Sequence, residues 1–291
     1  MSGEDPAPED LAAFTGVPPR VDCGKFDFPL MGPWCESMIE SQIESQCERQ
    51  ILGVNFYGGD AAGAIERICR DGGLLVVPAA PALKDIATNA SYRAALAGAD
   101  IAITDSAFMV IVWNLLEGDS VHRLSGLRYL RELLQRPDVQ KPGNTLWVMA
   151  GSSNARTNLA WLATHGNEVP SECVYVAPMY GDRVEDEELV ELVERLCIKH
   201  IVITLGGGTQ ERLGFFLKSR LTYRPAIHCV GAAIAFLSGD QIRIPDWADR
   251  LYLGWLLRCV SAPRRFVPRY LSAPKLVPLI LRYRDRLPIE R

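Results

Sequence analysis

The 291-residue chain lacks any uninterrupted apolar run that approaches the roughly 20 residues of a membrane-spanning helix. Its first residues also lack a cationic start followed by an apolar stretch, so the sequence predicts no signal peptide. We therefore expect a cytoplasmic protein. If it meets a membrane, we expect it to lie peripherally on the inner face of the membrane rather than to cross it.

Paired cysteines and clustered histidines are also missing. The eight cysteines contain no C-x-x-C pair, and Cys197 and Cys229 stand inside apolar runs. Buried, reduced thiols in a cytosolic protein are the simplest interpretation. The four histidines are scattered, without the H-x-x-x-H or carboxylate spacing of a zinc site, so we expect no metal.

The standard phosphate-binding motifs are absent as well. The chain has neither a Walker loop nor a G-x-G-x-x-G turn, which weighs against an NAD-dependent oxidoreductase. The net charge of -4 gives no reason to expect nucleic acid as a partner.

The charge that is present is unevenly distributed. From Gln241 to Arg291 there are eleven Lys or Arg against four Asp or Glu, a local charge of +7, so the first 240 residues carry -11. A basic end on an acidic body indicates a surface for lipid headgroups, phosphates or an acidic partner. The alternative is a solvated basic helical tail.

Apolar, β-branched runs alternate with helical spacing along most of the chain. The runs that predict strands are 73–78, 100–104, 145–150, 173–177, 200–204 and 226–230. Helical stretches are expected at 82–97, 123–135 and 186–197, where leucines and valines recur on one face. This alternation predicts an α/β fold with a Rossmann-like, mostly parallel sheet and helices on both faces.

The pattern changes near Trp247 to segments rich in Arg, Trp, Leu and Pro, which predict a C-terminal helical appendage broken into short pieces by prolines. We divide the chain into a partly mobile N-terminal extension (1–48), an α/β domain (49–245) and a basic helical appendage (246–291).

Ligands of such sheets bind outside the carboxyl ends of the strands. This rule selects the loops that begin at Asp105, Gly151 and Gly206. A partly desolvated Asp105 could act as a general base toward an attacking hydroxyl. Equally, Asp105 could be the N-cap of the following helix, since Asp and Ser are both good caps.

The loop after residues 200–204 contains Gly206, Gly207 and Gly208, followed by Thr209 and Gln210. Glycines allow close approach of the backbone to a phosphate, and a helix N-terminus favours negative charge. Gln210 offers a donor and an acceptor for a sugar hydroxyl or a base edge. A plain tight turn with a solvated first helical turn is an equally good interpretation.

Arginines and aromatic side chains are interleaved in the C-terminal segment. The guanidinium group matches phosphate geometry, while Trp and Tyr prefer the interface between water and lipid. The pattern fits a lipid pyrophosphate at a membrane face, or alternatively an Arg- and Trp-rich helix that packs on the body. The arginines are Arg243, Arg258, Arg264, Arg265 and Arg269.

Several motifs, taken in order, resemble the WecG/TagA/CpsF glycosyltransferases from about Ile51 to the C-terminus. The C-terminal segments 239–247, 253–258 and 262–271 are similar to the end signature of that family. Upstream, the similar segments are 99–105, the R-x-x-G stretch 123–126, 205–211 and 231–236.

The resemblance implies an inverting transferase with a nucleotide-sugar donor, typically UDP-linked, that extends a polyprenyl-pyrophosphate-linked glycan in cell-surface polysaccharide biosynthesis. It implies that Asp105 is the base and that Gln210 lies at the active site. We place Arg123 and Gly151 in the donor site, together with the loop of Gly206, Gly207, Gly208, Thr209 and Gln210. The basic segment from Arg243 to Arg269 is implied to dock at the membrane and cover the site.

The resemblance further implies no metal and no cofactor besides the UDP-sugar substrate. The expected partners are the donor, the lipid-linked acceptor, a membrane surface and a homo-oligomer.

Some positions depart from the family pattern. The polar T-P-N segment of the family is replaced by Val77–Pro81, the residue after the base is Ser106, and Thr209 and Gly254 stand where the family has Lys and Glu. These departures predict altered specificity. They also motivate an alternative function, a catalytically silent protein that binds a nucleotide sugar or scaffolds a synthesis complex.

Overall fold

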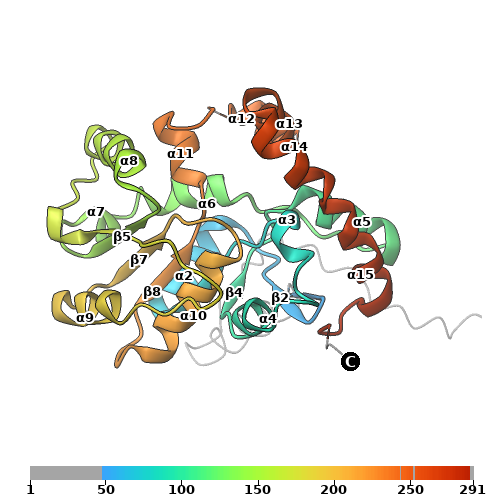
Figure 1. The fold of residues 1–291 in the computed structure, drawn as a ribbon, viewed down its shortest axis with the longest axis horizontal. Helices are drawn as coiled ribbons and strands as arrows, with labels where there is room; N and C mark the ends of the chain where they lie inside the picture. The colour runs from blue at the N-terminus through green and yellow to red at the C-terminus, as the bar shows by residue number, and fades with distance from the viewer. Residues whose placement is uncertain (1–47, 243, 252, 289–291) are drawn as a thin grey trace, which may run out of the picture. The chain divides into compact units, whose positions relative to one another are not determined.

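The structure is a computed structural model that describes residues 48–288 apart from 243 and 252. The predicted N-terminal extension, except residue 48, therefore lies outside the described residues, as does Arg243. The described part forms one compact unit in which the sheet and the C-terminal helices belong together (Figure 1).

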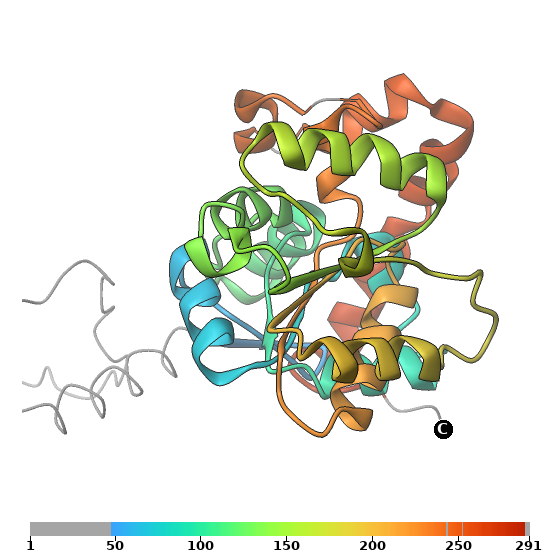
Figure 2. The ribbon, with the colours of Figure 1, turned by 90° about the vertical axis from the view of Figure 1, so that its left-hand side faces the viewer.

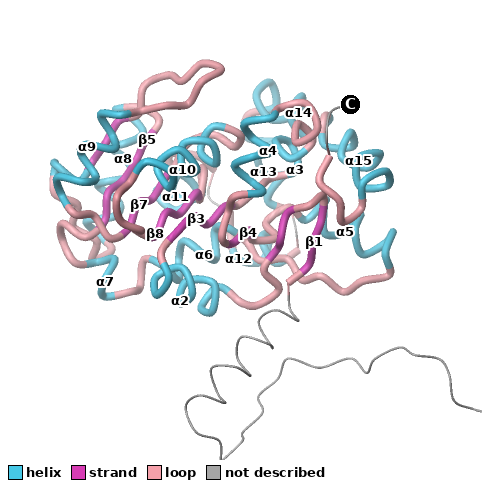
Figure 3. The backbone as a smooth tube through the Cα atoms, turned by 90° about the horizontal axis from the view of Figure 1, so that it is seen from below, coloured by secondary structure: helices cyan, strands magenta, loops and turns pink. Residues whose placement is uncertain are grey.

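Eight strands form one sheet in the order β1-β2-β4-β3-β8-β7-β5-β6 (Figure 3). All neighbouring pairs are parallel except β1 with β2, which form an antiparallel hairpin at one edge. The strands are β1 Arg49–Ile51, β2 Val54–Phe56, β3 Gly73–Val76, β4 Ile101–Ala102, β5 Thr145–Met149, β6 Val174–Val176, β7 His200–Ile203 and β8 Ala226–Cys229.

Helices follow most strands, as expected for parallel connections. They are α2 Ala61–Asp71, α3 Ala80–Leu83, α4 Ala90–Ala97, α5 Ala107–Glu117, α6 Gly126–Leu133, α7 Pro137–Gln140, α8 Ser152–Thr164, α9 Glu187–Leu196, α10 Thr209–Arg220 and α11 Ala233–Ser238. Short 3-10 turns occur at Ser171–Cys173 and Ala273–Lys275. The C-terminal helices are α12 Asp246–Arg250, α13 Gly254–Ser261, α14 Pro263–Leu271 and α15 Leu276–Tyr283.

The central strands are buried on both faces because helices cover each face (Figure 2). Leu74 and Val76 point into one core with α3, α4, α5, α9, α10 and α15, whereas Leu75 contributes to the other core with α2, α6, α8 and α11. The α/β fold with helices on both faces and C-terminal helices is confirmed.

The C-terminal helices, called the appendage below (α12–α15, residues 246–283), are anchored at both ends. Ala248 of α12 is fully buried in the core beside α6 and α11, and Leu276 and Ile280 of α15 are buried in the opposite core. Helix α15 runs beside α5 (Figure 1). Not every proline breaks a helix as predicted, because Pro268 lies inside α14.

The end of α15 is fastened to the hairpin turn between β1 and β2. The backbone N–H groups of Leu52 and Gly53 donate to the carbonyls of Arg284 and Asp285, at 2.7 and 2.9 Å. Gly53 has φ +73°, and a Cβ there would lie 2.5 Å from the Cβ of Leu287. The turn therefore requires glycine on both conformational and steric grounds.

Across the described ranges, no helix has both the length and the apolar character required to span a bilayer.

Candidate active site

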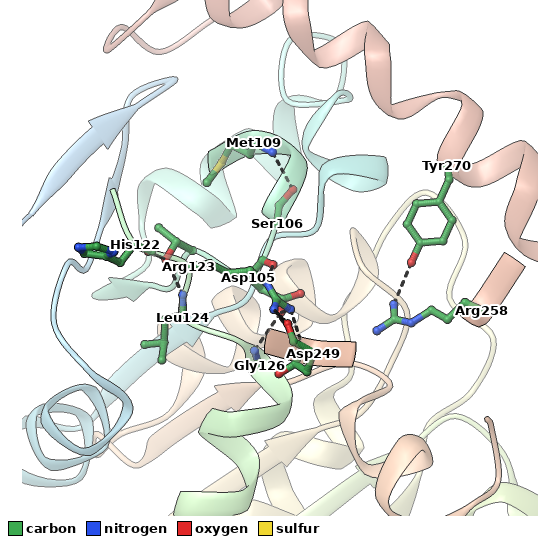
Figure 4. A network of polar contacts seen from close by, with 11 residues as sticks. Asp105, Ser106, Met109, His122, Arg123, Leu124, Gly126, Asp249, Arg258 and Tyr270 are labelled. Carbon is green, nitrogen blue, oxygen red and sulfur yellow. Dashed lines mark hydrogen bonds and ion pairs between the residues drawn. The ribbon is translucent and has the colours of Figure 1, made fainter. Parts of the chain in front are cut away.

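The carboxyl ends of the parallel strands bring the predicted site loops to one edge of the sheet. Asp105 follows β4 after Ile103 and Thr104. The Thr104 hydroxyl donates to the His122 carbonyl (2.7 Å) and accepts from the Leu124 N–H (2.9 Å). These bonds fix the segment that carries Arg123 beside Asp105 (Figure 4).

Hydrogen bonds orient the Asp105 carboxylate but leave part of it exposed to solvent. Its Oδ1 accepts from the Gly126 N–H at the start of α6 (2.9 Å) and from Arg123 Nη2 (3.3 Å), while its side chain remains 25% exposed. A Cβ at Gly126 would lie 2.9 Å from Val77 Cγ1, so a larger residue there would force a shift of Val77 or of α6. A backbone N–H and an arginine thus orient the carboxylate just beyond the carboxyl ends of the strands.

The helix after β4 is capped by the neighbour of Asp105. The Ser106 hydroxyl accepts from the Met109 N–H (3.2 Å) and is the N-cap of α5. The capping alternative for Asp105 is therefore wrong for α5, although its Oδ1 does accept the first N–H of α6.

Arg123 connects Asp105 to the appendage. Its Nε donates to the Asp105 carbonyl (2.6 Å), and its Nη1 and Nη2 each lie 3.0 Å from Asp249 Oδ1, with Nη1 also 3.0 Å from the Asp249 carbonyl. Arg123, expected in the donor site, is therefore engaged between two acids. Sequence reasoning missed Asp249, whose only signal was an acidic residue in a basic segment, 126 positions from its partner.

The triple-glycine loop forms the turn between β7 and α10. Gly208 has φ +92°, and its N–H donates to Glu211 Oε2 (2.6 Å). An added Cβ at Gly206 or Gly208 would meet no atom within 4 Å, so space remains beside this backbone. Burial of Glu211 raises the pKa of its carboxyl, against the lowering effect of its hydrogen bonds and of Arg269.

The buried side chain of Gln210 stabilises this turn through hydrogen bonds. The side chain is buried, its Oε1 accepts from the Gly231 N–H (2.7 Å) and its Nε2 donates to Glu211 Oε1 (3.2 Å). Both ends of the amide are used within the chain, between the loops that follow β7 and β8. Thr209 lies next to it as the first residue of α10, partly exposed.

The appendage approaches the turn through one arginine. The guanidinium Nη2 of Arg269 would lie 3.6 Å from a Cβ at Gly207. Arg258 instead packs over the Phe236 ring, 4.2 Å from its centroid, and donates to the Tyr270 hydroxyl (3.1 Å).

The structure describes the other predicted arginines only in part. Arg264 is exposed on α14, Arg243 is outside the described residues, and the side chain of Arg265 is not described. Gly151 begins the turn into α8 after β5; its backbone is extended, and a Cβ there would lie 3.7 Å from Asn154 Oδ1.

Asp105 and the triple-glycine turn share an edge but do not touch. Strands β3 and β8 lie between β4 and β7, so three strand spacings, about 14 Å, separate the two loops. The loops that begin at Val77 and Gly231 fill the interval. A ligand that used both features would therefore lie across the ends of four strands.

Two cavities lie elsewhere on the described part of the chain. One, of about 390 Å³, lies at the far ends of α6 and α8 beside Trp161, His165 and Asn167. The other, of about 230 Å³, lies between α13 and α14 beside Trp255 and Tyr270. Neither of them is lined by Asp105 or by the glycine turn.

Polar side chains also meet at the amino ends of the strands. Within the described ranges, Cys69, Asp138 and His200 place possible metal-ligating atoms within 4.8 Å of one another. Burial raises the pKa of the Cys69 thiol to about 11. Asp138 is already paired with Arg136 Nε (3.0 Å) and with His200 Nε2 (3.4 Å), which accounts for two of the three groups without an ion.

Comparison with known proteins identifies the family of this chain. The sequence model of the "Glycosyl transferase WecG/TagA/CpsF family" matches residues 49–288. The chain is also 26% identical over 215 residues to an "N-acetylglucosaminyldiphosphoundecaprenol N-acetyl-beta-D-mannosaminyltransferase" of Bacillus spizizenii, covering 72% of this chain and 80% of that protein. Because the family match covers most of its length, this chain belongs to the WecG/TagA/CpsF glycosyltransferase family.

Proposed function

We propose that this protein is an inverting glycosyltransferase that moves a sugar from a UDP-linked donor to a polyprenyl-pyrophosphate-linked glycan, in cell-surface polysaccharide biosynthesis. The observation that carries the proposal is Asp105, a partly exposed carboxylate held by Arg123 and the Gly126 N–H at the ligand edge of the sheet. The lipid-linked acceptor is inferred from the printed name of the Bacillus relative.

In the proposed reaction Asp105 removes the proton from an acceptor hydroxyl. Within the described residues its two side-chain contacts both fall on Oδ1, which leaves Oδ2 for the substrate. The oxygen then attacks the anomeric carbon from the face opposite the nucleotide, and the glycosidic bond to the diphosphate breaks. A fixed base of this kind is worth roughly 100- to 10,000-fold in rate.

The donor diphosphate is proposed to lie beside the triple-glycine turn. Open space at Gly206 and Gly208 allows backbone approach, and the N-terminus of α10 favours negative charge. Arg269 reaches the same turn and would stabilise the charge that develops on the leaving diphosphate. The extended form of a nucleotide diphosphate sugar suits the distance between the turn and Asp105.

The appendage is proposed to rest on the inner face of the cell membrane. Large apolar side chains are exposed on it, next to the exposed cations Arg264 and Arg269. Trp at such a position prefers the headgroup region, and the arginines favour anionic lipid. The exposed apolar residues are Trp247, Leu251, Trp255, Leu256, Val260, Leu271 and Leu281.

The second candidate is a catalytically silent protein that binds a nucleotide sugar or scaffolds a synthesis complex. It is favoured by the apolar segment Val77–Pro81, which follows β3 beside the Asp105 loop, because Val77 meets Gly126 at the place where Gly126 holds the carboxylate. A polar side chain that could bind a sugar hydroxyl is missing from that segment.

A transfer assay separates the two candidates. The full chain is incubated with a panel of UDP-sugars and a short-chain polyprenyl-diphosphate-linked N-acetylglucosamine acceptor, and calorimetry with UDP is run in parallel. Transfer to the lipid supports the enzyme. UDP binding without transfer or donor hydrolysis supports the silent protein, and neither binding nor transfer contradicts both.

A further inference from the structure

We propose that Cys69, Asp138 and His200 form a structural zinc site at the amino ends of the strands. The three side chains come from α2, α7 and β7, and their ligating atoms all lie within 4.8 Å of one another. Local spacing in the sequence does not reveal this trio, because its members belong to three separate elements. The proposal goes beyond the glycosyl transfer proposed above and gives the ion no part in that reaction.

The distances between the ligating atoms suit a tetrahedral ion. Zinc bonds of roughly 2.0–2.3 Å to nitrogen, oxygen and sulfur place the ligand atoms roughly 3.3–3.8 Å from one another. Asp138 Oδ2 and His200 Nε2 already lie 3.4 Å apart. The other separations do not exceed 4.8 Å, so the thiol of Cys69 has to move inward by about 1 Å or less.

The present contacts of Asp138 leave one of its oxygens available to an ion. Its Oδ1 accepts from Arg136 Nε at 3.0 Å, which orients the carboxylate. Its Oδ2 has Arg136 Nη2 and His200 Nε2 at 3.4 Å each, longer than the roughly 2.7–3.2 Å of an ordinary hydrogen bond. An ion between Oδ2 and His200 therefore replaces a weak contact. The Arg136 side chain is 37% exposed, so its charge stays in contact with water.

His200 is oriented by further buried groups, as metal-bound histidines commonly are. Its side chain is 4% exposed, and its Nδ1 lies 3.4 Å from His228 Nε2. The other ring nitrogen of His228 lies 2.7 Å from the Tyr129 hydroxyl. With zinc on Nε2, the proton of His200 is carried by Nδ1 and faces His228. This chain of contacts fixes the ring with Nε2 toward Asp138.

Zinc is the ion that this set of donors favours. Thiolate and imidazole are typical zinc ligands, whereas Mg²⁺ and Ca²⁺ take oxygen ligands. Without an ion the Cys69 thiol keeps its proton, because burial raises its pKa to about 11. A bound ion displaces that proton to solvent, and the thiolate and the Asp138 carboxylate then balance its two charges. The Asp138 side chain is 36% exposed, so water can supply the fourth ligand.

The expected consequence of zinc binding is a more stable fold. The site joins α2 and α7 to the first residue of β7, at the opposite ends of the strands from Asp105. An ion that binds the folded chain alone raises Tm, and at a free zinc concentration of about 100 times Kd we expect a rise of roughly 5–10 °C.

The test begins with zinc binding to the full-length chain after treatment with a chelator. Calorimetry in buffers of different protonation enthalpy should give about one ion bound and about one proton released per chain. Cobalt(II) in place of zinc should show the charge-transfer absorption of a thiolate bound to the metal. The absence of stoichiometric zinc binding overturns the proposal, and so does a cobalt spectrum without that absorption.

Cys69→Ser and Cys197→Ser form a matched pair of variants. Serine keeps the size of the side chain but is a poor zinc ligand. Since loss of an outer-shell group alone costs 10- to 100-fold in affinity, Cys69→Ser should weaken zinc binding by about 100-fold or more. Cys197 is an exposed thiol at the end of α9, so Cys197→Ser should keep the wild-type affinity and the rise in Tm. Equal zinc affinity of the two variants overturns the proposal.

Asp138→Asn keeps the test decisive if Cys69→Ser fails to fold. Its partly exposed side chain tolerates the change, and the weaker amide ligand should lower zinc affinity and remove most of the rise in Tm. An affinity equal to that of the wild type overturns the site. Removal of zinc should lower Tm while kcat of the folded chain stays the same. A kcat that falls with zinc occupancy in a chain that remains folded overturns the structural role.

Discussion

The two ends of the parallel strands carry different polar networks. Toward the amino ends, the buried side chains of Tyr129, His228 and His200 form a chain that ends at the half-buried carboxylate of Asp138, with contacts of 2.7, 3.4 and 3.4 Å. At the carboxyl ends, Asp105 and its partners form an ion-pair network.

The positions of the protons in this chain of hydrogen bonds follow from Asp138, its last member. The Asp138 carboxylate only accepts, so His200 Nε2 carries the proton that faces it. His200 Nδ1 then accepts from His228 Nε2, and His228 Nδ1 accepts from the Tyr129 hydroxyl. Burial lowers the pKa of both histidines, which keeps them neutral. Every group has a partner, whereas at the other end Asp105 Oδ2 has none within the described residues. We therefore expect catalysis at the carboxyl ends of the strands, where a carboxylate oxygen is left for a substrate.

The largest expected effect is on turnover at the carboxyl ends. Asp105→Asn should lower kcat by roughly 100- to 10,000-fold while UDP binding and the free energy of unfolding are retained, because only the base is removed. Asp138→Asn is the matched substitution at the amino ends and should keep kcat per folded molecule. Near-normal turnover of Asp105→Asn would show that the carboxyl ends of the strands do not supply the catalytic base.

Tyr129→Phe should act on stability alone. The change leaves His228 Nδ1 buried without its donor, which costs about 1–3 kcal/mol in the free energy of unfolding. Urea denaturation measures the loss, and transfer assays on the folded fraction should match wild type. A variant as stable as wild type would show that the hydrogen bond is not important for the fold.

The buried histidines predict a pH dependence of stability. Their pKa values are lowered from the ordinary 6.5, so below about pH 6.5 the unfolded chain binds protons that the folded chain does not. The free energy of unfolding should therefore fall as the pH is lowered through and below that value. Urea midpoints at pH 7.5, 6.5 and 5.5 test the slope, which should become shallower in His228→Asn.

The smallest effect is expected for Gly126→Ala. The new Cβ would lie 2.9 Å from Val77 Cγ1, so α6 must shift slightly and carry with it the N–H that holds Asp105 Oδ1. We expect a severalfold loss of kcat and a small change in stability. Gly181→Ala, where an added Cβ meets nothing within 4 Å, is the control. Equal kinetics of the two variants would argue against a precise role for the Gly126 contact.

Much of this fold was predictable from local pattern. The six apolar runs correspond to β3 to β8, because buried parallel strands are continuous in hydrophobicity; of the six, only the edge strand β6 is partly exposed. The hairpin of β1 and β2 was not predicted, since strands of three residues are too short to show a period. The rule that ligands of parallel sheets bind beyond the carboxyl ends of the strands led to Asp105 and to the glycine turn.

The remaining site features depend on contacts between distant segments. Asp249 is 126 positions from Arg123, and no periodicity connects them. Gln210 has the polarity of a binding residue, yet its burial against Gly231 is decided by how the loops after β7 and β8 pack. His200 and His228 look scattered in sequence, but β7 and β8 are neighbours in the sheet, which stacks their rings 5.7 Å apart.

The attachment of Arg284 and Asp285 to the β1–β2 turn has a consequence for the order of folding. Two N–H groups of the turn bond to carbonyls that lie 232 positions later in the sequence. The sheet edge therefore stays incomplete until residues 284 and 285 have been synthesised and have folded back, and such long-range closure is slow. Formation of this hairpin thus depends on the segment after α15 and not on its own two strands alone.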